Sequence, residues 1–473
     1  MYKKIFFNST IYVIGPQLPK IFGLFLLPFL TPYLTVKDYA VFGIVTAYTL
    51  IFSTSRDLGM SLILMNAFFK IPNRWKIVWR QIFSYLLIWG LLLAAIQALL
   101  LYFVIPSEAK DLRYLIILLF SLQCLLFEVP ILLGIRYYQL VEKPIYVSVI
   151  STIPGLIGLG LQYYFIAIEK YGYLGWFFST FISLGIMASI YFTILVFHLK
   201  IIPIFKIKKA RLMNSLKIAL PMLPHSYSSY LLNTSDRAML SLFKVPMGLI
   251  GVYNVAYTFG NYLEGLGSAV GVAVGPTYMR MFSQKGSDGS DVIFFTNILQ
   301  LIFTVVTFIL ALWSKELFNV MFNNDLFADA YVIGIIIIMS YSYRPLYWAI
   351  VGKLQYDDRT SILWKITFGA GVANVILNAI CIPIWGIYAA AFTTFFALLL
   401  QAFSGYFIVK VLLPMLKSTL YLWLIFILGL TLIAFLLKDS NNYIKVIITI
   451  ISFFLALFFV IKRIKLDNGK HNS

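Results

Sequence analysis

The segment IFSYLLIWGLLLAAIQALLLYFVI, residues 82–105, contains no charged side chain. A helix needs about 20 mostly apolar residues to cross a bilayer, so this segment predicts a membrane-spanning helix. Similar segments occur along the whole chain, and we expect an all-α polytopic membrane protein with about 14 transmembrane helices. The predicted spans are 9–34, 40–66, 82–105, 114–135, 145–168, 173–197, 218–242, 249–279, 292–314, 330–351, 361–384, 386–409, 418–437 and 446–461.

The composition excludes several classes of protein. Of the 473 residues, 61% are hydrophobic and 12% are charged. Soluble domains carry roughly 45–50% apolar and about 25% charged residues. So little polar surface excludes a cytosolic enzyme, a secreted disulfide scaffold and a disordered chain.

The net charge of +19 comes from 37 Lys and Arg against 18 Asp and Glu. Of the 37, 24 fall in loops on the side of both termini and 8 on the opposite side. The positive-inside rule then places both termini in the cytoplasm. We expect a multi-pass protein of the cytoplasmic (inner) membrane. Most of the net charge therefore reflects topology, not nucleic-acid binding.

Nine ionisable residues remain inside the predicted spans, where each charge is costly unless it faces protein or water. Such groups are functional candidates by default. The five bases are candidates for a cationic cavity, and the four acids for ion coupling. The bases are Lys20, Arg56, Arg237, Arg344 and Lys365, and the acids are Asp57, Glu128, Asp236 and Glu264.

Other interpretations of the same residues stay open. Lys20 and Lys365 lie near polar neighbours, so their ammonium groups can reach an interface. Adjacent residues on a helix point about 100° apart, so Arg56–Asp57 and Asp236–Arg237 do not close on themselves and can pair with other helices. Glu128 and Glu264 stand alone in apolar surroundings. Arg344 has aromatic neighbours and precedes Pro345, which predicts a kink.

The two halves of the chain repeat each other. Gln139 matches Gln355 at an offset of 216, Gly172 matches Gly386 at 214, and the stretch at Tyr39 matches that at Ile250 at 211. An even number of spans separates the copies, so the repeats share one orientation, a common construction in transporters. We predict a six-helix lobe over 1–205, a second over 206–417, and two extra helices with a cytoplasmic tail over 418–473.

Known catalytic signatures are missing from the sequence. It contains no phosphate-binding G-x-x-x-x-G-K-[ST] loop, and its three histidines are too scattered for a metal site. Cys124 and Cys381 belong to no C-x-x-C motif. We therefore expect no catalytic residues, no metal and no cofactor, and we favour a secondary transporter over a membrane enzyme.

Several stretches together resemble one family. They are LLPFLTPYLTVKDYAVF (26–42), DLGM (57–60), SDRAML (235–240), GVY (251–253), and Asn374-x-x-x-Asn378 followed by IPIWGIYAA (382–390). They resemble the bacterial polysaccharide flippases, the lipid-linked oligosaccharide branch of the multidrug/oligosaccharidyl-lipid/polysaccharide exporter superfamily. The chain departs from the family pattern at Ala40, where glycine is usual.

The resemblance implies two six-helix lobes around a central cavity that opens alternately to either side. It implies transport of an undecaprenyl-diphosphate-linked oligosaccharide for O-antigen or capsule synthesis, driven by a proton or sodium gradient. A polysaccharide polymerase and a chain-length regulator are further implied partners. A cation-coupled drug or metabolite antiporter of the same superfamily is the closest alternative. A multi-pass glycosyltransferase or polysaccharide polymerase is a third.

Overall fold

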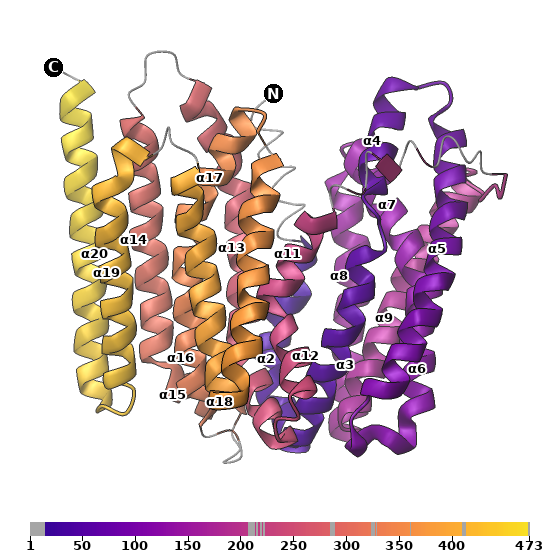
Figure 1. Cartoon of the computed structure of the whole chain (residues 1–473), viewed down its shortest axis with the longest axis horizontal. Coiled ribbons are helices and arrows are strands. Elements are labelled where there is room, and N and C mark those ends of the chain that lie inside the picture. Colours follow the sequence, from indigo (N-terminus) through magenta and orange to yellow (C-terminus); the bar gives the residue numbers. More distant parts are fainter. Residues whose placement is uncertain are drawn as a thin grey trace. The chain divides into compact units, whose positions relative to one another are not determined.

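The computed structural model is mostly helical over the residues that it describes, which are 15–206, 213, 216–217, 220, 223–283, 289–322, 327, 329–359, 361–408 and 413–471. None of these residues forms a β-strand. The chain divides into two compact units, Met1–Asn254 and Val255–Ser473. Figure 1 shows the helices of both units, coloured along the sequence from indigo at the N-terminus to yellow at the C-terminus.

The first unit contains ten α-helices among its described residues. They are α2 (Leu18–Leu30), α3 (Val36–Ser55), α4 (Met60–Lys70), α5 (Trp75–Val104), α6 (Arg113–Leu122), α7 (Glu128–Leu140), α8 (Pro144–Tyr163), α9 (Tyr173–Thr193), α11 (Leu223–Asn233) and α12 (Ser235–Leu242). The start of α3 is set by a capping box, in which Thr35 and Asp38 satisfy each other's backbone N–H groups.

The second unit begins inside α13 (Met247–Ser283), because the division falls after Asn254. The helices that follow are α14 (Ser290–Leu312), α15 (Ser314–Phe322), α16 (Ala330–Ser340), α17 (Arg344–Tyr356), α18 (Ser361–Ile408), α19 (Leu413–Leu436) and α20 (Asn442–His471). Two helices merge in α18, which is interrupted at Gly386. The predicted boundary between spans 11 and 12 lies beside this glycine.

Ten helical segments among the described residues are long and apolar enough to cross a membrane. They account for predicted spans 2 to 6 and 9 to 14, with spans 11 and 12 joined in one segment. Predicted spans 1, 7 and 8 fall on α2, on α11 with α12, and on α13, which are not among the ten. The helices α2, α11 and α12 have 13, 11 and 8 residues, fewer than a membrane span needs, and α13 carries glycines and polar residues that lower its hydropathy. The fold is that of a multi-pass membrane protein.

Several interruptions break helices inside predicted spans, and three of them lie next to candidate site residues. The predicted span 40–66 lies within the membrane-spanning segment Val36–Lys70, but its helix is broken where Leu58 and Gly59 adopt positive φ angles of 44° and 72° between α3 and α4. A π-helical turn, Gln123–Phe127, separates α6 from α7. A 3₁₀ turn, Tyr341–Tyr343, separates α16 from α17 directly before Pro345. Such interruptions leave backbone groups outside the regular helical ladder and often occur at functional positions.

The backbone repeats with the offset seen in the sequence. Gly172 and Gly386, which are 214 residues apart, have φ and ψ of 55° and −131°, and of 57° and −130°. Residues with a side chain rarely adopt a positive φ, so glycine suits both positions. The two glycines therefore mark equivalent turns in the two halves. The boundary between the lobes at 205/206 stays a prediction, and residues 207–212 directly after it lie outside the described residues.

Candidate functional site

The first unit holds an ion pair inside its predicted spans. Arg56, which follows α3, places its Nη1 3.0 Å from Oε2 of Glu128, the first residue of α7. The Arg56 side chain is 2% exposed and that of Glu128 27%. Arg56 Nη2 also donates to the Cys124 thiol in the π-helical turn. Sequence reasoning treated Glu128 as standing alone, whereas the fold gives it a buried cationic partner.

The break after α3 places Arg56 in this position. Trp89 donates its indole N–H to the Ser55 carbonyl over 3.1 Å, so a backbone acceptor at the end of α3 is satisfied. Asp57 accepts a hydrogen bond from the Ser61 backbone N–H over 2.9 Å. A carboxylate there satisfies an N–H in the first turn of α4 and opposes the positive end of the helix dipole. Asp57 therefore has a local structural task in addition to its predicted role in ion coupling.

The second unit holds a comparable pair. Nη2 of Arg344, the first residue of α17, lies 3.5 Å from Oε1 of Glu264 in α13. Their side chains are 14% and 25% exposed. The Arg344 guanidinium also lies over the Tyr341 ring, 5.4 Å from its centroid, in a cation–π arrangement. The aromatic neighbours predicted for Arg344 include this contact.

Asp236 and Arg237 belong to a third buried group, at the start of α12. Arg237 donates from Nε to Oδ1 of Asn254 over 2.8 Å and from Nη1 to the Asn233 carbonyl over 2.9 Å. The Tyr253 hydroxyl donates to Asp236 Oδ2 over 2.7 Å. Asn254 donates in turn to the Tyr39 carbonyl of α3 over 3.0 Å. This network ties α12 and the start of α13 to α3, so it holds the first unit together.

Lys20 and Lys365 are exposed near the starts of α2 and α18. The structure does not bring these two lysines into either buried ion pair. Their predicted reach toward an interface agrees with this exposure.

A buried ion pair that sequence reasoning missed lies in the second unit. Lys445 of α20 was assigned to a loop, but its side chain is 0% exposed and Nζ lies 2.7 Å from Oε1 of Glu316 in α15. The same Nζ donates to the Lys438 carbonyl over 2.7 Å. The sequence offered one signal for this burial, because Lys445 directly precedes the strongly apolar residues of the predicted span 446–461.

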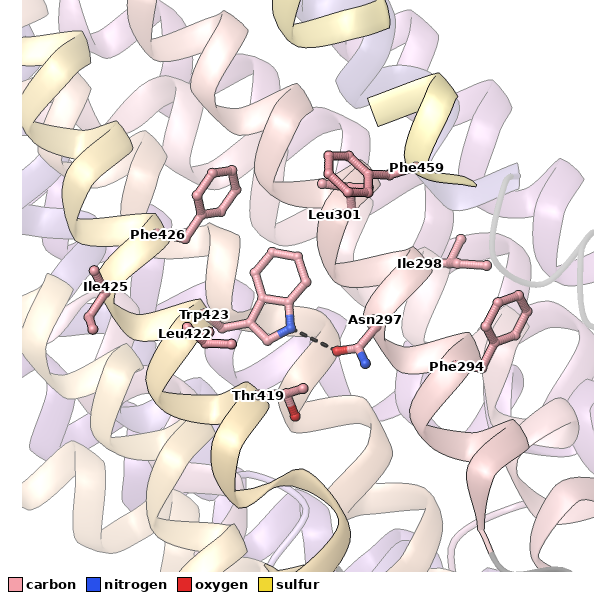
Figure 2. A pocket seen from close by; sticks show the side chains of 10 residues that line it. All are labelled: Phe294, Asn297, Ile298, Leu301, Thr419, Leu422, Trp423, Ile425, Phe426 and Phe459. Carbon is pink, nitrogen blue, oxygen red and sulfur yellow. Dashed lines mark hydrogen bonds between the residues drawn. The ribbon is translucent and has the colours of Figure 1, made fainter. Parts of the chain in front are cut away.

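An apolar pocket of about 490 Å³ opens between α14, α19 and α20. Figure 2 shows its lining, in which Trp423 of α19 donates its indole N–H to Asn297 of α14 over 2.8 Å. The rest of the lining consists almost entirely of aliphatic and phenyl side chains. Such a surface suits a hydrocarbon chain and offers little to a charged group.

Within the described part of the chain, no three His, Cys, Asp or Glu side chains gather as a metal site requires. The arrangement instead offers guanidinium groups held by carboxylates. In both pairs the Nε of the arginine is buried and has no hydrogen-bond acceptor among the described residues. Each guanidinium therefore keeps a donor for an additional anionic or polar oxygen.

Comparison with known proteins gives two kinds of likeness. A family model described as "Polysaccharide biosynthesis protein" matches residues 2–282. A search of curated proteins by sequence finds no match.

Among solved structures, the lipid II flippase MurJ in an inward closed conformation matches with a TM-score of 0.60 and 15% identity, over 98% of this chain and 99% of that chain. A MATE protein in complex with MaL6 gives a TM-score of 0.57 at 12% identity, over 87% and 96%. A mutant of the Vibrio cholerae MATE transporter VcmN gives 0.53 at 11% identity, over 88% and 97%. At these identities the likeness shows the fold.

Proposed function

The chain belongs to the polysaccharide biosynthesis protein family, and from this premise we propose that it is a flippase for lipid-linked oligosaccharides. Its substrate is an undecaprenyl-diphosphate-linked oligosaccharide, moved from the cytoplasmic to the outer leaflet for O-antigen or capsule synthesis. Both termini lie in the cytoplasm, and a polysaccharide polymerase and a chain-length regulator receive the product. The chain acts as a secondary transporter and not as an enzyme.

The observation that carries the proposal is the presence of two arginines at helix interruptions inside membrane-spanning segments, Arg56 buried and Arg344 largely buried. A diphosphate is an anion that guanidinium groups bind through paired, charge-assisted hydrogen bonds. Arg56 and Arg344 each hold a carboxylate at present and each retain a free Nε donor. Exchange of the carboxylate for a phosphate oxygen keeps the charge of the guanidinium neutralised throughout.

The remaining candidates take supporting roles in the same proposal. Arg237, Lys20 and Lys365 add positive charge along the path of the headgroup. Glu128, Glu264, Asp57 and Asp236 are the candidates for coupling to a proton or sodium gradient during alternating access. The apolar pocket beside Trp423 suits the hydrocarbon part of the same substrate (Figure 2).

The likeness of the fold to MATE proteins supports a second candidate, a cation-coupled drug or metabolite antiporter. Organic cations favour a binding site with excess acid. The nine intramembrane candidates contain five bases and four acids, and each buried pair is neutral. This balance favours an anionic headgroup over a cationic drug. A glycosyltransferase or polymerase is the third candidate, and it predicts sugar transfer by the purified chain alone.

Deletion and complementation in the native host test the proposal. Loss of the gene should abolish surface polysaccharide and leave the lipid-linked oligosaccharide on the cytoplasmic side, and the wild-type chain should reverse both effects. Arg56→Gln and Arg344→Gln should fail to restore export although the protein is present in the membrane. Lys315→Gln, in an exposed ion pair, is the matched control and should restore it. Normal surface polysaccharide in the deletion strain contradicts the proposal.

A further inference from the structure

The helices α7 and α17 occupy equivalent places in the two halves, and their register is fixed at both ends. Each follows an interruption, each has 13 residues, and their first residues, Glu128 and Arg344, are 216 apart. Each ends in the same turn, in which Glu142 and Asp358 have φ angles of 54° and 55°. The Lys143 N–H bonds the Tyr138 carbonyl over 3.0 Å, and the Arg359 N–H bonds the Leu354 carbonyl over 2.9 Å. Glu128 and Arg344 are therefore equivalent residues with opposite charges.

The partner helices correspond as well. The α3 helix begins at Val36 and α13 at Met247, which is the offset of 211 found in the sequence. The residue equivalent to Arg56 is then Gly267, and Glu264 lies about one helical turn before it. A Cβ built on Gly267 would lie 3.6 Å from Cγ of Arg344. The Arg344 side chain therefore lies next to Gly267, the position that is equivalent to Arg56 in the first unit.

The two ion pairs therefore share one place in the repeat and differ in direction. In the first unit the arginine follows the first helix and the acid begins the second. In the second unit the acid lies on the first helix and the arginine begins the second. In both, the arginine is more deeply buried than the acid, with exposed fractions of 2% against 27% and 14% against 25%. In both, the arginine Nε lacks an acceptor among the described residues.

We propose that the two pairs are one repeated site with inverted polarity, in which Glu128 and Glu264 are positioning residues for the guanidinium of their own unit. Each half requires a guanidinium neutralised by a carboxylate beside the interrupted helix, and the helix that supplies the guanidinium is interchangeable. Exchanging Arg and Glu within a pair leaves the summed length of the two side chains unchanged. Removing the carboxylate leaves the guanidinium buried without its anion, which is strongly unfavourable.

The stability test is a double-mutant cycle on the purified full-length protein. Arg56→Glu and Glu128→Arg should each lower the melting temperature, because each places two like charges together. The exchanged variant Arg56→Glu/Glu128→Arg should recover at least half of that loss. The reverse exchange Glu264→Arg/Arg344→Glu tests the second unit in the same way and keeps the inference testable where one variant fails to fold. Additive losses in both units would overturn the inference.

The transport test, which rests on the proposed function, measures export of lipid-linked oligosaccharide in the deletion strain. Each single variant should lose at least about tenfold of the export, equivalent to about 1.4 kcal/mol in a rate-limiting barrier, and each exchanged variant should export at least about threefold more than either of its single variants. The doubly apolar variant Arg56→Met/Glu128→Leu should keep the melting temperature of wild type but lose export. If the pair had only a structural role, this variant would keep its export as well. Exchange of the exposed pair, Lys315→Asp/Asp439→Lys, is the control and should change neither quantity.

The outcomes separate the two claims. If the wild-type chain does not restore export in the deletion strain, the proposed function fails, and the melting temperatures still decide whether the pairs are interchangeable. If wild type exports but an exchanged variant is folded and inactive, the position of the arginine matters and the inference is wrong. Full export by the doubly apolar variant would also overturn it.

Discussion

Gly134 of α7 faces the ring of Tyr191 in α9. A Cβ at this position would overlap the ring, whereas a Cβ at Gly160 of α8 would meet nothing within 4 Å. Gly134→Ala should therefore lower the free energy of unfolding by about 1–3 kcal/mol through overpacking. Gly160→Ala is the matched control and should leave stability unchanged or raise it by up to about 1 kcal/mol, because alanine favours the helix. Thermal unfolding in detergent measures both, and equal melting temperatures would contradict the packing described for α7 and α9.

Tyr253 donates to the fully buried carboxylate of Asp236. Tyr253→Phe removes that donor and leaves the ring in place. The expected loss is about 1.5–3 kcal/mol, which is typical of a hydrogen bond to a charged group. Tyr164→Phe loses a comparable hydroxyl bond to Glu169 at an exposed site and should lose less than 1 kcal/mol or so. Chemical denaturation of the two variants checks this, and an equally small effect at both sites would show that the Asp236 network does not stabilise the first unit.

At the scale of elements, the α19–α20 hairpin is held to the rest of the second unit through Lys445 and Glu316. Lys445→Met should leave the Glu316 carboxylate without its cation and cost about 3 kcal/mol. Hydrogen exchange should rise first in residues 419–459. Lys438→Met is the matched control, since its backbone carbonyl still accepts from Lys445, and the side chain gives up a contact with the Phe435 ring and an attraction to the exposed Asp439. Unchanged exchange in Lys445→Met would mean that the hairpin is held by apolar packing alone.

A second ion pair, between Lys315 and Asp439, joins the same elements at the surface. The hydrogen bonds from Lys315 and Tyr331 hold the pKa of Asp439 below its usual range. A carboxyl with a lowered folded-state pKa stabilises the fold above its unfolded-state pKa of about 3.9, and this stabilisation is lost as pH falls through the folded-state pKa. Because both side chains are exposed, it amounts to at most about 1 kcal/mol. Lys315→Met should thus lower the melting temperature slightly at pH 7 and not below about pH 3, whereas a pH-independent difference would contradict the ionic origin.

Element by element, the sequence predicted what depends on local hydropathy. The apolar run of α5 and the separation of spans 11 and 12 at Gly386 could be read directly. The break after α3 was missed because Arg56-Asp57-Leu58-Gly59 is short and lies inside an apolar run. The partners of Glu128 and Glu264 were missed because helix packing brings together residues far apart in the chain. No local pattern encodes such a contact.

For the whole molecule, the distribution of Lys and Arg predicts that both termini are cytoplasmic. Green fluorescent protein fused to the C-terminus should fluoresce, and alkaline phosphatase fused there should be inactive. Alkaline phosphatase inserted in the 439–441 turn should be active, because the same rule predicts that turn on the opposite side of the membrane. The reverse pattern would contradict the predicted orientation and, with it, the direction of transport.

The central claim is that the chain moves a lipid-linked oligosaccharide across the bilayer, and reconstitution tests it most directly. The purified protein is placed in vesicles that contain undecaprenyl-diphosphate-linked oligosaccharide with a label on the sugar, and a membrane-impermeant glycosidase reports which leaflet holds the sugar. We predict that an ion gradient increases the rate at which protected label becomes accessible, relative to protein-free vesicles and to Arg56→Gln. Label that stays protected at the protein-free rate, with uptake of an organic cation in the same vesicles, would contradict the account and favour the antiporter.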